Sequence, residues 1–180
     1  ELNKTLDSST GERASLVDVA STLKRPPFGL KDGIIPLLLV LALTSRSSDV
    51  ALYEHGSLVL KLDDAVAERM ARNLGHFSVK NSGANSGGRR VVIEQLSDRL
   101  GIKDNGDTPS FLRVARALYR EVQTQPAFTH QTRARLSTKA RAVRDSFRLA
   151  SEPDNLVFVD LPTILECQPF PPSVPVTKRR

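Results

Sequence analysis

The sequence has few cysteines and histidines, the residues from which disulfides and many metal sites are built. Among its 180 residues there is one cysteine, Cys167, and there are three histidines, His55, His76 and His130, far apart in the sequence. One cysteine cannot form an internal disulfide and cannot supply a cysteine-based zinc site. So little cysteine suits a reducing compartment, which predicts a cytoplasmic location. Scattered histidines argue against a histidine-rich metal centre, so we expect no metal and no cofactor.

The longest apolar stretch is too short to cross a bilayer. It covers residues 34–43, IIPLLLVLAL, which is ten residues, about half of the ~20 that a transmembrane helix requires. No charged-then-apolar signal sequence opens the chain, and we expect no membrane association. The first residue is Glu1 rather than Met, from which we expect the chain to be part of a longer protein that carries its active machinery elsewhere.

The motifs of common catalytic sites are also missing from the sequence. There is no Walker A loop, no Gly-x-Gly-x-x-Gly and no His-Glu-x-x-His. The Gly-rich stretch 86–89 lacks a Gly-Lys-Ser ending and does not follow an apolar strand, so it predicts a linker. Asp63, Asp64 and Glu68 come nearest to a carboxylate cluster for Mg²⁺, but a helix cap and a surface Glu explain them better. We expect this chain to be non-catalytic.

The first half of the chain has a regular order of helices and strands. Apolar spacing predicts three helices, over about 15–23, 33–44 and 63–73. A break with two prolines and a glycine separates the first two helices. Residues 50–60 predict a β-hairpin that turns at His55-Gly56, and residues 76–80 alternate as a further strand. The order helix, turn, helix, hairpin matches a helix-turn-helix followed by a wing.

The second half is predicted to be helical. We expect helices over about 91–100, 109–123 and 134–150, a strand-like run over 156–159 and then a tail. Together these patterns predict a mainly α protein with a small β-hairpin (α+β), winged-helix-like in its first half and helical in its second. We divide it into a flexible lead-in (1–13), a winged-helix-like domain (14–80), a Gly/Ser-rich linker (81–90), a helical basic domain (91–165) and a proline-rich tail (166–180).

The second predicted helix is unusual because every residue from Ile34 to Leu43 is apolar, Pro36 included. A helix that is apolar all round is expected to be buried on most sides, and a domain of this size buries only part of its chain surface, so another chain could supply some of the cover. A DNA-reading helix at this position presents polar side chains to the groove. The winged arrangement could therefore serve packing or protein contact instead.

Basic charge is concentrated in one part of the chain. The net charge is +6, yet between Arg113 and Arg148 nine basic residues face two acidic ones, a local excess of +7. Helical periodicity places these arginines in two stripes, and guanidinium groups suit phosphate oxygens. A solvated face or a protein-docking face explains the same pattern. The candidate nucleic-acid-binding residues are Arg113, Arg116, Arg120, Arg133, Arg141, Arg144 and Arg148, with Lys24, Arg25 and Lys31 in the first domain.

Two stretches of the chain resemble a known bacterial region. The first covers residues 23–43 and 49–80, with a Pro-Pro-Phe-Gly turn before an apolar helix. The second covers residues 132–162, with a Glu-Pro-Asp…Asp-Leu-Pro ending. They resemble the region downstream of the ATPase domain in large P-loop proteins of phage-defence islands, such as BREX-type ATPases. The resemblance implies a non-catalytic module attached to a nucleotide-driven motor. It carries over no ATP site, because the ATPase motifs are absent from these 180 residues.

Two functions remain open at this point. One is a DNA-binding or docking module of an anti-phage defence ATPase that contacts phosphates, independently of sequence, through its arginine-striped helices. Its partners would be DNA, another defence-system protein or the rest of the parent ATPase. The alternative is a protein-interaction or oligomerisation module that does not bind nucleic acid.

Overall fold

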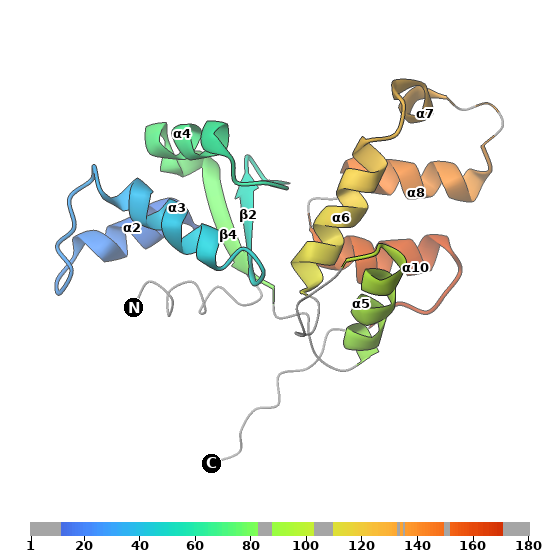
Figure 1. The fold of residues 1–180 in the computed structure, drawn as a ribbon, viewed down its shortest axis with the longest axis horizontal. Coiled ribbons are helices and arrows are strands. Elements are labelled where there is room, and N and C mark those ends of the chain that lie inside the picture. Colours follow the sequence, from blue (N-terminus) through green and yellow to red (C-terminus); the bar gives the residue numbers. More distant parts are fainter. Residues whose placement is uncertain are drawn as a thin grey trace, which may run out of the picture. The chain divides into compact units, whose positions relative to one another are not determined.

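The structure, a computed structural model, describes residues 12–82, 88–102, 110–132, 134, 136–149 and 152–170. The chain separates into two compact units, residues 1–83 and residues 84–180, which we call unit 1 and unit 2 (Figure 1). The division falls within the tract that the sequence assigns to a linker. Residues 83–87 of that tract, 1–11 of the expected lead-in and 171–180 of the expected tail lie outside the described residues.

The described residues of unit 1 form three α-helices and a small antiparallel sheet. Its elements are β1 (Ala14–Ser15), α2 (Leu16–Lys24), α3 (Ile35–Ser45), β2 (Val50–Glu54), β3 (Ser57–Leu58), α4 (Asp64–Arg72), the 3₁₀ turn η1 (Leu74–His76) and β4 (Phe77–Asn81). The strand order is β1-β4-β2-β3. The sheet is larger than the expected hairpin, because β4 pairs with both β1 and β2.

Local signals explain where most of these elements begin. The Ser15 hydroxyl accepts the Val17 N–H at the start of α2, and an Asp63 carboxylate oxygen accepts the Val66 N–H at the start of α4. The hairpin turns at His55 and Gly56, both at positive φ (49° and 82°), as a two-residue turn between twisted strands requires. The predicted helices, hairpin and further strand of this unit are confirmed.

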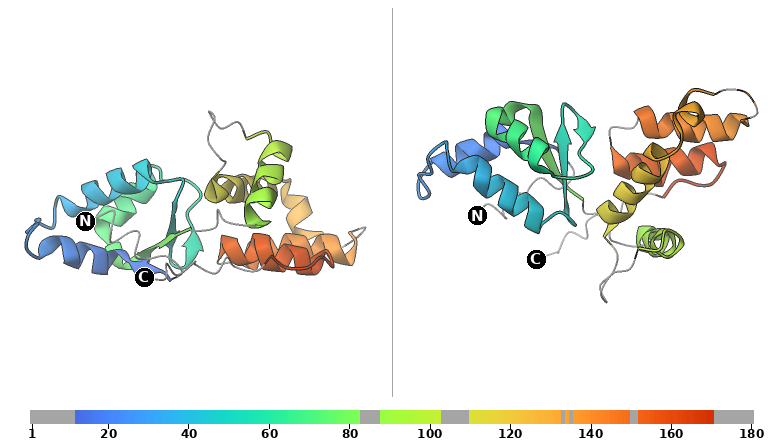
Figure 2. Two further views of the ribbon diagram at one scale, coloured as in Figure 1. Left: turned by 90° about the horizontal axis from the view of Figure 1, so that it is seen from below. Right: turned by 45° about the horizontal axis from the view of Figure 1, so that its top comes forward.

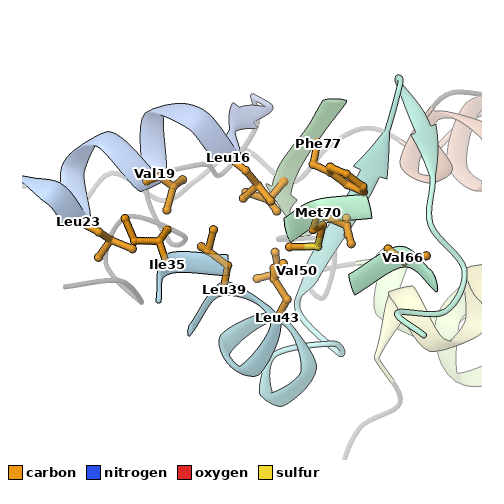
Figure 3. Packing of buried hydrophobic residues seen from close by; sticks show 13 residues of the cluster. Leu16, Val19, Leu23, Ile35, Leu39, Leu43, Val50, Val66, Met70 and Phe77 are labelled. Atoms are coloured by element: carbon orange, nitrogen blue, oxygen red, sulfur yellow. The ribbon is translucent and has the colours of Figure 1, made fainter. Parts of the chain in front are cut away.

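The core of unit 1 lies between α2, α3, α4 and one face of the sheet. Helices α2 and α3 run side by side (Figure 2), and Leu16, Val19 and Leu23 of α2 point toward α3 (Figure 3). Met70 of α4 closes the cluster and is fully buried. The remaining core residues come from all three helices and the strands: Ala20, Ile35, Leu39, Leu43, Val50, Leu52, Val66, Phe77 and Val79.

Helices and helical turns are the regular structure of the described residues of unit 2. It consists of α5 (Gly88–Arg99), α6 (Phe111–Gln123), α7 (Ala127–Gln131), α8 (Thr138–Leu149), α9 (Pro153–Asn155), the π-helical turn η2 (Leu156–Asp160) and α10 (Leu161–Ile164). Helices α8 and α10 lie side by side (Figures 1 and 2). The whole protein is therefore mainly α with a small β part, as the sequence predicts.

One element of unit 2 was predicted wrongly. The apolar run 156–159 is a π-helical turn and not a strand. Leu156, Val157 and Phe158 are all buried, and a short apolar run cannot by itself distinguish a buried strand from a buried helix.

The starts of two helices also differ from the expectation. Helix α8 begins at Thr138 rather than near 134, with the Ser137 hydroxyl accepting the Ala140 N–H. Helix α6 begins at Phe111 rather than at residue 109, which lies outside the described residues. Within the described ranges, no helix has both the length and the apolar character needed to span a membrane.

Candidate functional site

Helix α3 buries one side and leaves an apolar stripe on the other. Ile35, Leu39 and Leu43 are at most 4% exposed, whereas three large residues between them face outward: Ile34 (47%), Leu37 (67%) and Leu41 (66%). We call Ile34, Leu37 and Leu41 the α3 outer face. Their spacing of three and then four residues places them along one side of a helix. The expectation that this helix is buried on most sides is wrong, because unit 1 covers one side only.

Polar groups do not offset this exposed apolar surface. From Gly33 to Ser45 the sequence holds no charged residue, although the solvent face of a helix on a globular protein is normally polar. Isolated exposed apolar residues are ordinary, whereas a contiguous group on one helix face indicates an interaction site. The α3 outer face is the least ordinary surface feature of unit 1.

Basic residues lie next to the start of α3. Lys24 forms an ion pair with Asp32. Ile34 occupies the N-cap position of α3 and makes no side-chain hydrogen bond there. Arg25 and Lys31 are exposed. These three cations were candidate phosphate contacts, and the ion pair makes Lys24 the least suitable of them.

The arginines of α6 lie on the side opposite its buried residues. Arg113 and Arg120 are exposed, and Arg116 is half-buried. The opposite side of the helix carries Phe111, Leu112, Val114, Ala115 and Tyr119, all buried. The amphipathic pattern that the sequence predicts for this helix is therefore present, and two of its three arginines reach solvent.

The arginines of α8 have different surroundings from one another. Arg148 is exposed and Arg141 is half-buried. Arg144 is only 15% exposed, and its Nη1 donates to the carbonyls of Thr132 at 2.6 Å and Thr129 at 3.1 Å. These carbonyls belong to the end of α7, where a cation is favourable. Arg144 thus ties α7 to α8 and has little capacity left for phosphate. Arg133 lies outside the described residues.

Tyr119 is a buried polar group in the core of unit 2. Its ring meets the Phe147 ring edge-on at 5.4 Å between centroids, and its hydroxyl has no hydrogen-bond partner among the described residues. Burial, with a smaller contribution from the nearby carboxylates of Asp160 and Glu152, raises the pKa of Tyr119 to about 12. The phenol therefore stays protonated at neutral pH and is unsuited to acid–base catalysis there.

Two histidines that are far apart in sequence meet at the hairpin. The His55 N–H donates to the His76 carbonyl at 2.8 Å, and the two rings lie 4.1 Å apart between centroids. The Asn73 amide oxygen accepts the Gly75 N–H, so its NH₂ group faces His76 Nε2 at 3.0 Å. The Asn73 NH₂ group can only donate, so this contact is a hydrogen bond in the His76 tautomer that carries its ring proton on Nδ1. Only the pairing of β2 with β4, in which Glu54 faces Phe77, brings these rings together.

Two surfaces thus stand out, the α3 outer face in unit 1 and the exposed arginines Arg113, Arg120 and Arg148 in unit 2. The part of the chain that the structure describes has no group of three or more His, Cys, Asp or Glu side chains that could hold a metal ion. No family model, curated protein or solved structure matches this chain.

Proposed function

We propose that this chain is a non-catalytic docking module, and that the α3 outer face inserts into an apolar groove on the motor part of a defence-type P-loop ATPase. The single observation that carries the proposal is the exposure of Ile34, Leu37 and Leu41 on one side of a helix. Anchors at positions i, i+3 and i+7 are the pattern by which a helix is recognised in a hydrophobic groove.

The chemistry of the groove follows from that of the helix. Because residues 33–45 carry no charge, a matching groove is apolar and uncharged along the length of α3. Three aliphatic side chains cannot supply the ~800 Å² per partner that a stable interface buries. A groove that encloses the helix also reaches the half-buried Leu38 and Val40, whereas a flat surface does not.

The choice of partner rests on the resemblance to regions downstream of defence ATPase domains and on charge. Residues 1–83 carry ten basic and ten acidic side chains. A neutral unit gains little from electrostatic steering. We therefore expect burial of apolar surface, rather than attraction to a polyanion, to stabilise a complex between unit 1 and its partner.

Site-specific photocrosslinking tests this function. A benzoylphenylalanine residue replaces Leu37 in the native host, and the same residue at Val17, an exposed position on α2 (45%), is the matched control. We expect a crosslinked adduct at position 37 only, with mass spectrometry identifying the ATPase, and Leu41→Glu should remove it. Equal adducts at both positions, no adduct, or an adduct with a second copy of this chain would overturn the proposal.

A second candidate function is nucleic-acid binding by unit 2. The observation that favours it is the exposure of Arg113, Arg120 and Arg148 within the segment that holds the +7 excess. Guanidinium contacts with phosphate bind any sequence and depend steeply on salt. Three such contacts predict roughly a 40-fold loss of affinity between 50 and 200 mM salt.

Duplex DNA binding measured by fluorescence anisotropy distinguishes this candidate from the first. Arg120→Glu with Arg148→Glu should abolish binding, whereas Leu37→Glu should leave it unchanged. If the chain does not bind duplex DNA at 50 mM salt, or if the arginine variants bind as the unmodified chain does, the second candidate fails and the first is unaffected.

A further inference from the structure

The chain reverses direction after α10 and returns to the body of unit 2. Glu166 adopts a left-handed conformation with φ of 62°, which costs a residue other than glycine some free energy. Its carboxylate pairs with Lys139 of α8 at 2.9 Å. Gln168 and Pro169 are exposed, and the Phe170 ring then meets the Phe158 ring edge-on at 6.5 Å between centroids.

The Phe158 carbonyl holds Phe170 through a backbone hydrogen bond, because it accepts the Phe170 N–H at 2.8 Å. Phe158 lies in the π-helical turn η2, in which the Leu161 N–H donates to the Leu156 carbonyl. Pro162, which follows, has no N–H that could compete with that of Phe170.

Arg89 of α5 holds the other side of Phe170. Its Nη2 donates to the Phe170 carbonyl at 3.0 Å, and its guanidinium carbon lies 4.4 Å from the centroid of the Phe158 ring. Burial lowers the pKa of Arg89 below its ordinary value, and the negative charge of Asp154 partly opposes this. Its Nε is buried without a hydrogen-bond partner among the described residues. The Arg89 guanidinium group therefore makes directed contacts with Phe170 and Phe158, while its Nε–H lacks a hydrogen-bond partner among the described residues.

We propose that Arg89 and Phe158 form a recognition site for an extended Phe-Pro segment, which the chain fills with its own Phe170 as a displaceable latch. Both backbone groups of Phe170 are bonded and its ring lies against an aromatic side chain. Main-chain hydrogen bonds combined with an aromatic surface are the means by which extended and proline-rich segments are recognised. Residue 171 is proline, which cannot donate a further backbone hydrogen bond, so recognition centres on the aromatic residue.

Few contacts secure this latch, which is why the site can exchange its occupant. The backbone at Glu166 is strained, the Lys139–Glu166 pair is exposed on both sides (52% and 76%), and exposed pairs of this kind contribute little. A Phe-Pro segment supplied by another molecule offers the same two hydrogen bonds and ring contact without the strained reversal. Occupation by such a segment would release Phe170 from Arg89 and from the Phe158 carbonyl.

A peptide-binding experiment with full-length protein tests the site. The probe is the peptide QPFPPSV, the sequence of residues 168–174, and the control peptide is QPAPPSV. We expect Phe170→Ala protein to bind the probe at least tenfold more tightly than the unmodified protein, because the competing latch is absent. Adding Arg89→Ala should abolish binding. The control is Arg90, the adjacent arginine, which pairs with Glu94 at 2.8 Å. Adding Arg90→Ala instead should leave binding of the probe unchanged.

Folded Phe170→Ala protein that does not bind the probe, or that binds both peptides equally, would overturn the proposal. If the Phe170→Ala protein fails to fold, hydrogen exchange on the unmodified protein tests the proposal instead. The Phe170 amide should exchange at least tenfold faster than the buried Ala115 amide of α6, and faster still with excess probe. Equal protection of the two amides, unaffected by the probe, would show that the segment opens only with unit 2 as a whole.

Discussion

Glu54 of strand β2 and Arg69 of helix α4 form an ion pair with two parallel hydrogen bonds, from Nε to Oε1 at 2.6 Å and from Nη2 to Oε2 at 2.9 Å. The pair joins the sheet to the helix that covers it. The hydrogen bond from Arg69 is the main reason why the pKa of Glu54 lies below its ordinary value, and burial works against it. The same bond raises the pKa of Arg69.

The pair makes unit 1 sensitive to acid. Because the folded-state pKa of Glu54 lies below the ordinary value of 4.5, its contribution to stability is fully present above pH ~5.5. This contribution is lost as pH falls below 4.5 and through the folded value. We expect Glu54→Gln to reduce the stability of unit 1 at pH 7 and to flatten its decline between pH 6 and pH 3, as measured by urea unfolding. Glu68→Gln, which removes the exposed Glu68–Arg72 pair, is the control and should have little effect.

Arg144 is predicted to act on stability rather than on ligand binding. Replacing it with alanine leaves the Thr129 and Thr132 carbonyls without their donor, at a cost of about 1.5–3 kcal/mol for hydrogen bonds that involve a charged group. Arg148→Ala, at an exposed position of the same helix, should change stability by less than about 0.5 kcal/mol. Denaturant unfolding of both variants makes the comparison. Equal costs would mean that the carbonyl contacts of Arg144 are not maintained in solution.

Leucines on opposite sides of α3 should lose very different amounts of stability on truncation. Leu39 is fully buried, so Leu39→Ala should destabilise unit 1 by about 2–5 kcal/mol. Leu37 is 67% exposed, and Leu37→Ala should cost less than about 0.5 kcal/mol, since alanine is also the better helix former. Thermal and urea unfolding measure both. A large cost at Leu37 would indicate that its side chain is covered in the free protein.

The hydroxyl of Tyr119 should be dispensable for folding. With no hydrogen-bond partner among the described residues, its removal in Tyr119→Phe loses no bond and ends a desolvation cost, so stability at pH 7 should stay equal or rise by up to about 1 kcal/mol. The raised pKa of about 12 means that the folded state keeps the phenol proton where the unfolded chain releases it. Stability should therefore fall as pH rises from about 10 to about 12, and less so in the variant. A loss of stability at pH 7 would contradict this.

Short-range signals made much of unit 1 predictable from its sequence. Ser15 and Asp63 cap the helices that follow them, and His55-Gly56 turns the hairpin, because each acts on backbone within a few residues. The pairing of Ala14 with Val79 was not predictable in this way. Strands of two residues carry no pattern of their own and form only where a partner edge is already present.

Side-chain roles in the candidate sites depended on contacts between distant segments. Periodicity placed Arg144 beside the apolar stripe of its helix, but only the position of α7 decides that its guanidinium binds carbonyls. Periodicity also cannot select a buried side in a helix that is apolar all round, so the outward side of α3 at Leu37 was not apparent. The Phe170 site needed Pro162, Arg89 and Phe158 together, and these lie in separate segments of the sequence.

The strand order of unit 1 sets the order in which it can be completed during synthesis. Strand β4 lies between β1 and β2. Strand β1, the first to be synthesised, therefore cannot pair until β4 (Phe77–Asn81) has left the ribosome, and β2 lacks its β4 neighbour until the same moment. Until then the hairpin has an open edge, and the apolar faces of α2 and α3 have only part of their cover. A chaperone that binds nascent apolar segments could therefore bind residues 16–76 during the interval before residue 81 is synthesised.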